Sequence, residues 1–543
     1  MASRAVVWFR RDLRVADHPA LLAALDAADQ VVPVFVVDRA LLDGRPSGPN
    51  RRAFLHGALQ ALARDLEALG GRLLVLEGDP VTVIPALARQ ANADAVWCSR
   101  EHTPYARRRD TAVEGALRAD GRALHPMPGV YLSDFDELRT TDGNPFRVYS
   151  PFARAAKAAA WDDPLPAPTR VPVPENLTTG GLGAGGLWTT EPPASGDRLR
   201  SPTGGLGAEP GEFGLGTGVN GLGAEPGRFA AGRSGLDLFG LDGAVEITPP
   251  DSGVALERLR WFLDQRVDRY ARARNFMGTD GTSRLSPYLR FGLVSPRQVA
   301  AAAGRRGQAG EHPRRAGDRE TFVNELLWRD FYGYVLYHQP ESAWEHMRPE
   351  FARFGFEDDP DGLAAWREGR TGYPLVDAGM RQLTGKGWAH NRARMVVASF
   401  LTKHLLVDWR EGARFFLQHL MDGDLPSNNG GWQWVAGTGT DAAPYYRIFN
   451  PVTQAEKFDP DGDYIRRWVP ELSKLQPPAI FAPWTATLDD LQAAGIRLGV
   501  DYPHPIVDHM TARNRALARY QEASTHGSRS SSSASSETAR SGG

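Results

Sequence analysis

One nine-residue segment, Asn324–Tyr332, brings a carboxylate, a guanidinium and aromatic rings together at helical spacing. In a helix, side chains three or four residues apart share a face, which here carries Glu325, Trp328, Arg329 and Tyr332. Such a face can line a pocket, because an indole stacks on a flat ligand while a carboxylate binds its polar edge. The alternative is an ion pair between Glu325 and Arg329 on a solvated surface.

A second segment, Gly281–Pro287, has the residue types of an anion site. Ser286 is a favourable N-cap and Pro287 a favourable first helical residue, so the segment predicts the start of a helix. The hydroxyls of Thr282 and Ser283 would then lie beside backbone N–H groups at a helix N-terminus, which attracts phosphate. A plain turn before a helix is the alternative.

A third stretch, 378–407, contains no acidic residue. Its basic residues are Arg381, Lys386, Arg392, Arg394 and Lys403. A local patch of this kind suits contact with phosphates, and a solvated basic helix face is the alternative. His390 lies in the same stretch, where a single histidine is more typical of structure than of catalysis.

Asp422 and Asp424 open a fourth segment that continues through Asn428 to Trp434. Two nearby aspartates can bind a metal, but no His or Glu stands at ligand spacing, so the sequence predicts no metal site. Carboxylates that accept hydrogen bonds from a ribose or from ring N–H groups fit a nucleotide pocket better.

These side chains need a scaffold, and the first 130 residues predict an α/β domain. Apolar runs typical of buried strands alternate with helical segments; the strands are expected at 5–9, 31–37, 73–76 and 95–98, and the helices at 20–28, 52–69 and 80–90. This alternation predicts a parallel, Rossmann-like sheet with helices on both faces. The first strand-to-helix turn lacks the G-x-G-x-x-G fingerprint of dinucleotide binding.

The rest of the chain divides by composition. Residues 131–250 predict an interdomain linker whose Gly-rich stretch, 178–245, nearly repeats residues 205–213 at 221–229. Because glycine is costly to order, we expect a flexible low-complexity insertion; a partner-binding element is the alternative. Residues 251–520 predict an all-α domain, since amphipathic segments recur and β-runs are scarce. Residues 521–543, rich in Ser, Gly and Arg, predict a disordered tail.

Composition excludes several classes of protein. The single cysteine, Cys98, excludes a disulfide framework and any cysteine-based zinc or iron–sulfur site, and it fits a reducing cytoplasm. We find no signal peptide and no run of about 18 apolar residues that predicts a membrane span. The net charge of −2 over 543 residues means that a nucleic-acid ligand must bind a local basic patch.

Taken together, the motifs resemble the photolyase/cryptochrome family, and within it the bacterial cyclobutane-dimer photolyases of class I. The opening Val7–Arg14, Val-Trp-Phe-Arg-Arg-Asp-Leu-Arg, is similar to the family's first strand and turn. The segments Gly281–Ser286, Asn324–Tyr332, Thr371–Ser399 and Asp408–Phe458 are similar almost continuously. The resemblance covers about 1–160 and 250–520 and leaves out the Gly-rich insertion and the Ser-rich tail.

The resemblance implies an α/β antenna domain and a helical domain that holds one reduced FAD in a folded conformation. By motif position, the FAD-binding residues are Tyr270, Thr282, Ser283, Arg284, Leu285, Ser286, Phe322, Arg329, Asp422, Gly423, Asp424 and Asn428. Asn428 falls beside flavin N5, where asparagine resembles photolyases, while plant cryptochromes have aspartate and animal ones cysteine.

The resemblance further implies UV-damaged DNA, single- or double-stranded and of any sequence, as the partner of a monomeric enzyme. The matching DNA-side residues are Arg274, Glu325, Trp328, Tyr332, Asn391, Arg392, Arg394, Met395, Trp434 and Gln454. Glu325, Asn391 and Asn428 take the catalytic positions. Enzymes that repair (6-4) photoproducts carry histidine at the positions of Asn391 and Met395, so the sequence disfavours that activity.

Two departures from the family pattern concern light and electrons. The chain of three tryptophans that reduces the flavin matches Trp432 and Trp409, but the distal position is Phe356, which is harder to oxidise. Trp344 or a nearby tyrosine would have to substitute for the distal tryptophan.

The second departure concerns the antenna position. Where folate-binding relatives carry Asn-Glu, this chain has Tyr105-Ala106. We therefore expect 8-hydroxy-5-deazaflavin as the antenna chromophore, with folate disfavoured and FMN or an empty site as alternatives.

The resemblance thus implies deoxyribodipyrimidine photo-lyase activity, in which light-driven electron transfer from reduced FAD splits a flipped-out cyclobutane pyrimidine dimer. A blue-light sensor of the cryptochrome type, with the same pocket, is the alternative. A flavin oxidoreductase that works in the dark is the third reading, and nothing in the sequence resembles its nicotinamide site.

Overall fold

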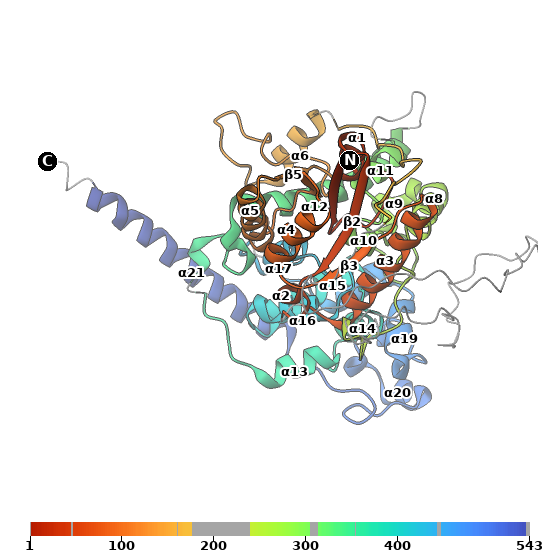
Figure 1. Cartoon of the computed structure of the whole chain (residues 1–543). Helices are drawn as coiled ribbons and strands as arrows, with labels where there is room; N and C mark the ends of the chain where they lie inside the picture. Colours follow the sequence, from red (N-terminus) through yellow and green to blue (C-terminus); the bar gives the residue numbers. More distant parts are fainter. Residues whose placement is uncertain are drawn as a thin grey trace, which may run out of the picture.

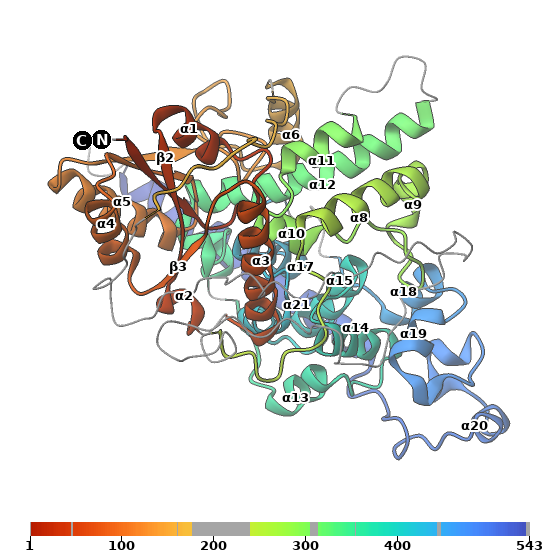
Figure 2. The same ribbon diagram turned by 45° about the vertical axis from the view of Figure 1, so that its right-hand side comes forward.

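The computed structural model describes residues 2–44, 47–159, 161–175, 239–304, 313–352, 354–441 and 447–538. An α/β half, red to orange in Figure 1, carries the N-terminus, and a helical half, green to blue, carries the C-terminal helix. Figure 2 shows the two halves side by side. The residues predicted as the Gly-rich insertion lie outside the described residues, apart from 239–245.

A five-stranded parallel sheet, in the order β3-β2-β1-β4-β5, forms the α/β half, which confirms the predicted parallel sheet and adds one strand to it. The strands are β1 (Arg4–Phe9), β2 (Gln30–Val37), β3 (Leu74–Glu77), β4 (Ala95–Ser99) and β5 (Ala123–Met127). The sequence did not predict β5 or the helix before it. Strand β5 is an edge strand with partly exposed residues and a proline, so it lacks the apolar run that marks the inner strands.

Period-two alternation of the strand residues sends side chains to both faces of the sheet. Ala5, Val7 and Phe9 of β1 join one core with helices α1 (Pro19–Ala27) and α3 (Pro49–Ala68). Val6 and Trp8 join a second core with α4 (Pro80–Gln90) and α5 (Pro104–Ala119). The short α2 (Arg39–Leu42) follows β2.

The segment between the halves is anchored at both ends. Helix α6 (Tyr149–Ala158) contacts the helical half, because its Phe152 ring packs 5.3 Å from Phe331. At the other end, Phe239 is buried against His56, and the backbone N–H of Val245 donates to Asn50 Oδ1. The last residues of the predicted flexible insertion, 239–245, therefore belong to the packed structure.

The helical half follows the prediction of an all-α domain. Its helices are α8 (Ser252–Gln265), α9 (Tyr270–Ala273), α10 (Ser286–Phe291), α11 (Pro296–Ala303), α12 (Pro313–His338), α13 (Pro360–Glu368), α14 (Pro374–Lys386), α15 (Asn391–Ser399), α16 (Trp409–His419), α17 (Leu425–Ala436), α18 (Pro451–Phe458), α19 (Asp463–Trp468), α20 (Leu488–Ala494) and α21 (His509–Thr538). A π-helical turn, Phe400–His404, follows α15 directly.

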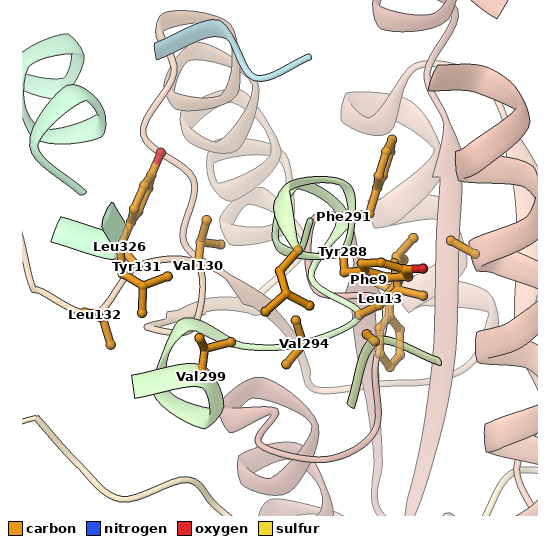
Figure 3. Packing of buried hydrophobic residues seen from close by; sticks show 14 of the residues in the cluster. Phe9, Leu13, Val130, Tyr131, Leu132, Tyr288, Phe291, Val294, Val299 and Leu326 are labelled. Carbon is orange, nitrogen blue, oxygen red and sulfur yellow. The ribbon is translucent and has the colours of Figure 1, made fainter. Parts of the chain in front are cut away.

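The core of the sheet face under α1 and α3 continues into the helical half. Figure 3 shows Phe9 and Leu13 near Tyr288, Phe291 and Val294, which come from α10 and the turn after it. Gly292 has φ +72°, and a Cβ there would meet the Arg11 carbonyl oxygen at 2.1 Å. The two halves therefore approach through bare backbone at this point.

The C-terminal helix departs from the predicted disordered tail. Helix α21 continues to Thr538, beyond Tyr520, where the low-complexity sequence begins. The segment after Tyr520 contains no proline, and it includes Ala, Glu and Arg, so nothing in it forbids helical backbone. None of the described helices is long and apolar enough to cross a membrane.

Candidate functional site

The predicted phosphate-binding segment, Thr282–Ser286, is held by Arg258 of α8. The Arg258 guanidinium donates to the carbonyl oxygens of Thr282 and Ser283 and pairs with Asp280. The prediction that Ser286 is an N-cap is wrong: Ser286 is the first residue of α10, and its hydroxyl accepts from Trp388 Nε1 at 3.3 Å. No side chain caps this helix, so its first N–H groups remain available to an external acceptor.

Asp422 and His390 carry the buried polar atoms that fit a cofactor. Asp422 Oδ2 accepts from Arg394 at 2.8 Å, while Asp422 Oδ1 is buried without a hydrogen-bond partner among the described residues. His390 Nδ1 accepts from the Arg392 N–H, and His390 Nε2 likewise lacks a partner there. Burial, together with four surrounding arginines, lowers the pKa of His390 to about 3. The Asp422 carboxylate oxygen can accept from an N–H or O–H group of a flavin dinucleotide. The neutral His390 ring already accepts at Nδ1, so its Nε2–H can donate to a carbonyl or phosphate oxygen of the same molecule.

Asp424 has a different environment from Asp422. Its carboxylate pairs with Arg11 of the α/β half and accepts from Ser427 Oγ at 2.9 Å. Burial would raise the pKa of Asp424, but Arg11 and Arg290 lower it to about 2. Arg290 and Arg51 both donate to the Gly423 carbonyl oxygen. Asp424 and Gly423 therefore join the two halves of the molecule.

Glu325 and Arg329, which were predicted to share one face of α12, bind different partners. Glu325 pairs with Arg274 of the segment after α9, and not with Arg329. Arg329 instead donates to the carbonyl oxygens of Val130 and Leu289, and its guanidinium lies 4.7 Å from the Tyr131 ring centre. Arg329 thus faces the α/β half, while Glu325 stays on the side of Arg274.

Three aromatic rings surround Trp328. Its indole stacks on the Tyr149 ring with centroids 3.6 Å apart and planes 5° apart. Phe331 and Tyr332 make edge and tilted contacts with it at 5.9 and 5.7 Å. Nearby, Phe322 and Tyr270, two predicted FAD-pocket residues, pack edge to face at 5.4 Å. The sequence did not single out Tyr149, because no spacing along the chain relates it to Trp328.

The predicted DNA-side residues of α15 and its surroundings are partly accessible. Asn391 is exposed and donates weakly to Met395 Sδ at 3.8 Å. Arg392 hydrogen-bonds Asn275 and lies 4.3 Å above the Phe458 ring. Two further predicted residues, Trp434 and Gln454, are half-buried.

The basic stretch 378–407 does not form one patch, so that prediction is wrong. Lys403 is buried in the π-helical turn, where burial lowers its pKa to about 7. Arg381 pairs with Glu471, and Lys386 pairs with Glu246. The five basic residues are spread over α14, α15 and the π-helical turn, and a stretch that folds in this way does not keep one side outward.

The predicted electron-transfer residues lie in the core of the helical half. The Trp432 ring is 5.0 Å from Phe416 and 6.1 Å from Trp366, a buried tryptophan that the sequence did not assign a role. Trp409 Nε1 donates to His346 Nδ1 at 3.3 Å. The His346 ring stacks 6.1 Å from Phe356, so rings connect Trp409 to the predicted distal position.

Asn428 and the residues at the predicted antenna position are oriented by hydrogen bonds. Asn428 Nδ2 donates to the Ala413 carbonyl at 3.1 Å and to Asn429 Oδ1 at 2.9 Å, which leaves its amide oxygen as an acceptor.

At the carboxyl ends of the strands, the Tyr105 hydroxyl donates to Asp38. The Arg107 guanidinium donates to the Tyr337 carbonyl at 3.1 Å. Tyr105 and Ala106 thus present a phenol and a methyl group at the predicted antenna position.

No group of three or more metal-ligating side chains occurs among the described residues. Within the candidate site, each aspartate already binds arginine, Asp422 to Arg394 and Asp424 to Arg11.

Comparison with known proteins gives consistent matches. The family model described as DNA photolyase matches residues 5–171, and that described as the FAD binding domain of DNA photolyase matches residues 322–522. A protein named deoxyribodipyrimidine photo-lyase from Agrobacterium fabrum is 39% identical over 516 residues, 95% of this chain and 97% of that protein.

Two solved structures extend the comparison. A bacterial class III photolyase from Agrobacterium tumefaciens has a TM-score of 0.79 and 36% identity, with 97% of this chain and 98% of that chain covered. A cryptochrome from Synechocystis has a TM-score of 0.77 and 28% identity, with 96% and 99% covered.

Proposed function

The chain belongs to the photolyase/cryptochrome family, and from that premise we propose that it repairs cyclobutane pyrimidine dimers in DNA under blue or near-UV light. The observation that carries the proposal is the constellation on α12, where the partly exposed Trp328 indole lies beside the Glu325–Arg274 ion pair. A stacking ring, a carboxyl and a phosphate-binding cation are the groups that an extruded dinucleotide needs.

FAD is the cofactor that the chain fits. The unpartnered atoms Asp422 Oδ1 and His390 Nε2, with the uncapped start of α10, would hold its sugar, ring and phosphate groups. Reduced FAD, when bound, would supply the light-driven electron that opens the dimer. Asn428 would hold the flavin ring, because its amide oxygen can accept from N5–H while its amide nitrogen is already bound to Ala413 and Asn429.

The DNA would bind by its backbone and present the lesion to the pocket. Arg274, Arg392 and Arg394 would contact phosphates, which gives affinity without sequence preference. A damaged dinucleotide costs only a few kcal/mol to extrude, and Trp328 and Trp434 would stack on its bases for about 1–3 kcal/mol each. Tyr332, Met395 and Gln454 would complete the contact surface.

Glu325 and Asn391 would bind the polar edge of the dimer. Burial raises the pKa of Glu325, whereas Arg274 lowers it, and burial prevails. The carboxyl can therefore share a proton with a thymine carbonyl oxygen and stabilise the negative charge that develops there. Asn391 and Met395 replace the histidines of (6-4) enzymes, which supports cyclobutane dimers as the substrate.

The class of photolyase is a separate question from the substrate. The motifs most resemble class I enzymes, whereas one solved structure with 36% identity is a class III photolyase. The proposal rests on the residues that would touch the dimer and does not depend on the class.

We also propose a second, light-harvesting chromophore, 8-hydroxy-5-deazaflavin, in preference to folate, FMN or an empty site. Tyr105 and Ala106, where folate-binding relatives carry Asn-Glu, support the preference over folate. Mass spectrometry of the chromophores released from the purified protein tests this; recovery of a folate would refute it.

We further propose that the enzyme is a cytoplasmic monomer. Gel filtration with light scattering can test the oligomeric state.

The repair activity has a direct test. The purified protein with bound reduced FAD is incubated with an oligonucleotide that carries one cyclobutane thymine dimer, in blue light and in darkness. We expect restored thymines only in light, and no repair of a matched (6-4) oligonucleotide. Repair of the (6-4) product alone would refute the proposed substrate.

A cryptochrome-type sensor is the second candidate, favoured by the similarity to the Synechocystis cryptochrome and by the long helix α21. That reading predicts bound flavin and a light-dependent absorption change but no dimer repair in the same experiment.

A further inference from the structure

The closest aromatic stack among the described residues joins the linker to α12. The Tyr149 and Trp328 rings are nearly parallel, 5° apart, with centroids separated by 3.6 Å. Every other ring pair in the described residues has its centroids at least 4.1 Å apart. A flat contact at this distance occupies one face of the indole.

Hydrogen bonds and packing fix Tyr149 in place. Its hydroxyl donates to the Asn324 carbonyl oxygen at 3.0 Å, one helical turn before Trp328. Burial and the nearby Glu325 raise the pKa of Tyr149, so the ring remains a neutral phenol. Phe152, one turn further along α6, packs independently against Phe331, which holds the helix against α12.

We propose that Tyr149 is a positioning residue for the DNA lesion: it covers one face of the Trp328 indole, so that an extruded base can stack only on the opposite face. The inference rests on the proposed function, in which Trp328 stacks on the dimer. Phe331 and Tyr332 meet the indole at its edge or at a tilt and cannot replace the flat contact. A ring that is already oriented loses less freedom when the base binds.

This role predicts that loss of the Tyr149 ring changes the binding of damaged DNA only. Loss of the Tyr149 ring should weaken binding of dimer-containing DNA about two- to tenfold, the usual strength of one aromatic pair. Binding of undamaged DNA should not change, because the phosphate contacts of Arg274 and Arg392 do not involve Tyr149. The light-driven yield of repair in saturated complexes should also stay constant, because Tyr149 does not touch the reacting bonds.

The experiment compares Tyr149→Leu, Tyr149→Phe and Trp328→Ala as FAD-loaded proteins kept in darkness. Dissociation constants are measured for one oligonucleotide with and without a single cyclobutane dimer. We expect Tyr149→Leu to lose part of the preference for the dimer and Tyr149→Phe, which keeps the stacked ring, to retain it. His125→Leu is the matched control, since it removes a ring stacked 4.2 Å from Trp97 in the α/β half and should leave the preference intact.

The outcomes separate this inference from the proposed function. If Trp328→Ala keeps the full preference, the proposed role of Trp328 fails, and the inference fails with it. If Trp328→Ala loses the preference but Tyr149→Leu does not, or loses affinity equally for both DNAs, only the inference is overturned. Should Tyr149→Leu fail to fold, Tyr149→Met, which fills the volume without a ring, gives the same comparison.

Discussion

At the scale of single residues, two opposed effects act on the pKa of the Glu325 carboxyl. Burial raises the pKa of its carboxyl, and the ion pair with Arg274 lowers it. A DNA phosphate that draws Arg274 away would remove the opposing effect and leave a carboxyl that binds a proton more readily. A protonated carboxyl can donate to a thymine carbonyl, which a carboxylate cannot do.

This reasoning predicts different consequences for two substitutions. Glu325→Gln keeps a hydrogen-bond donor and should retain much of the repair quantum yield. Glu325→Ala leaves the thymine carbonyl without a partner and should lower the yield about tenfold, the cost of a hydrogen bond to a charged group. Quantum yields measured on saturated complexes distinguish the two variants, and equal yields would contradict the proposed role.

At the scale of structural elements, the proposed route of flavin photoreduction runs through Trp409 of α16 and aromatic residues of the segment before α13. Trp409 connects through His346 to Phe356, a ring that is hard to oxidise. Trp344 is a poor substitute, because the Arg414 guanidinium lies 5.5 Å from its ring centre and disfavours a positive charge there.

We therefore predict slow photoreduction in the parent protein, with repair by chemically reduced enzyme intact. Phe356→Trp should accelerate photoreduction, as followed by flavin absorption under blue light with an external reductant. Repair by the chemically reduced variant serves as the control and should equal that of the parent. A variant that photoreduces no faster would count against the route through this position.

The π-helical turn after α15 connects to α21 through a buried histidine. His404 Nε2 lies 2.9 Å from His509 Nδ1, and burial, with His509, Lys403 and Arg515 nearby, lowers the pKa of His404 to about 3. Because the unfolded chain protonates this histidine near pH 6.5, the stability it contributes is complete above that pH and is lost as pH falls toward 3.

Acidification from pH 6.5 to about pH 5 should therefore cost about 2 kcal/mol of unfolding free energy at His404. His404→Gln cannot titrate, so its unfolding free energy should fall less steeply over the same range. Urea unfolding at a series of pH values measures both curves. Parallel curves for parent and variant would show that His404 does not carry this pH dependence.

The sequence predicted those elements whose own residues show a clear pattern of burial. The apolar runs of β1 to β4 and the boundaries of α4 were predictable, because burial on both faces of a parallel sheet leaves an unbroken signature. Strand β5 was missed because none of its residues is fully buried, whereas β3, the other edge strand, is an apolar and mostly buried run. Arg329, Lys403 and Tyr149 were not predictable in detail, since their partners Val130, Arg447 and Trp328 lie far away in the chain.

At the scale of the whole molecule, the halves meet through bare backbone at Gly292. Gly292→Ala would strain a residue with φ +72° and drive its Cβ into the Arg11 carbonyl oxygen, 2.1 Å away. Gly121→Ala is the matched control, because Gly121 has φ +71° and nothing within 4 Å of its added Cβ. Both variants carry backbone strain, but only Gly292→Ala carries the clash, which should cost about 1–3 kcal/mol more. Equal losses in thermal unfolding would contradict the interface.

At the same scale, the proposed repair requires FAD bound in the helical half next to the extruded dimer. Its most direct test is a titration of flavin-depleted protein with FAD, in which bound flavin and light-driven dimer repair are measured in the same samples. We predict that repair rises in proportion to bound reduced FAD, reaches its limit at one FAD per chain and is absent in darkness. A protein that cannot bind FAD, or whose repair does not follow its FAD content, would contradict the account.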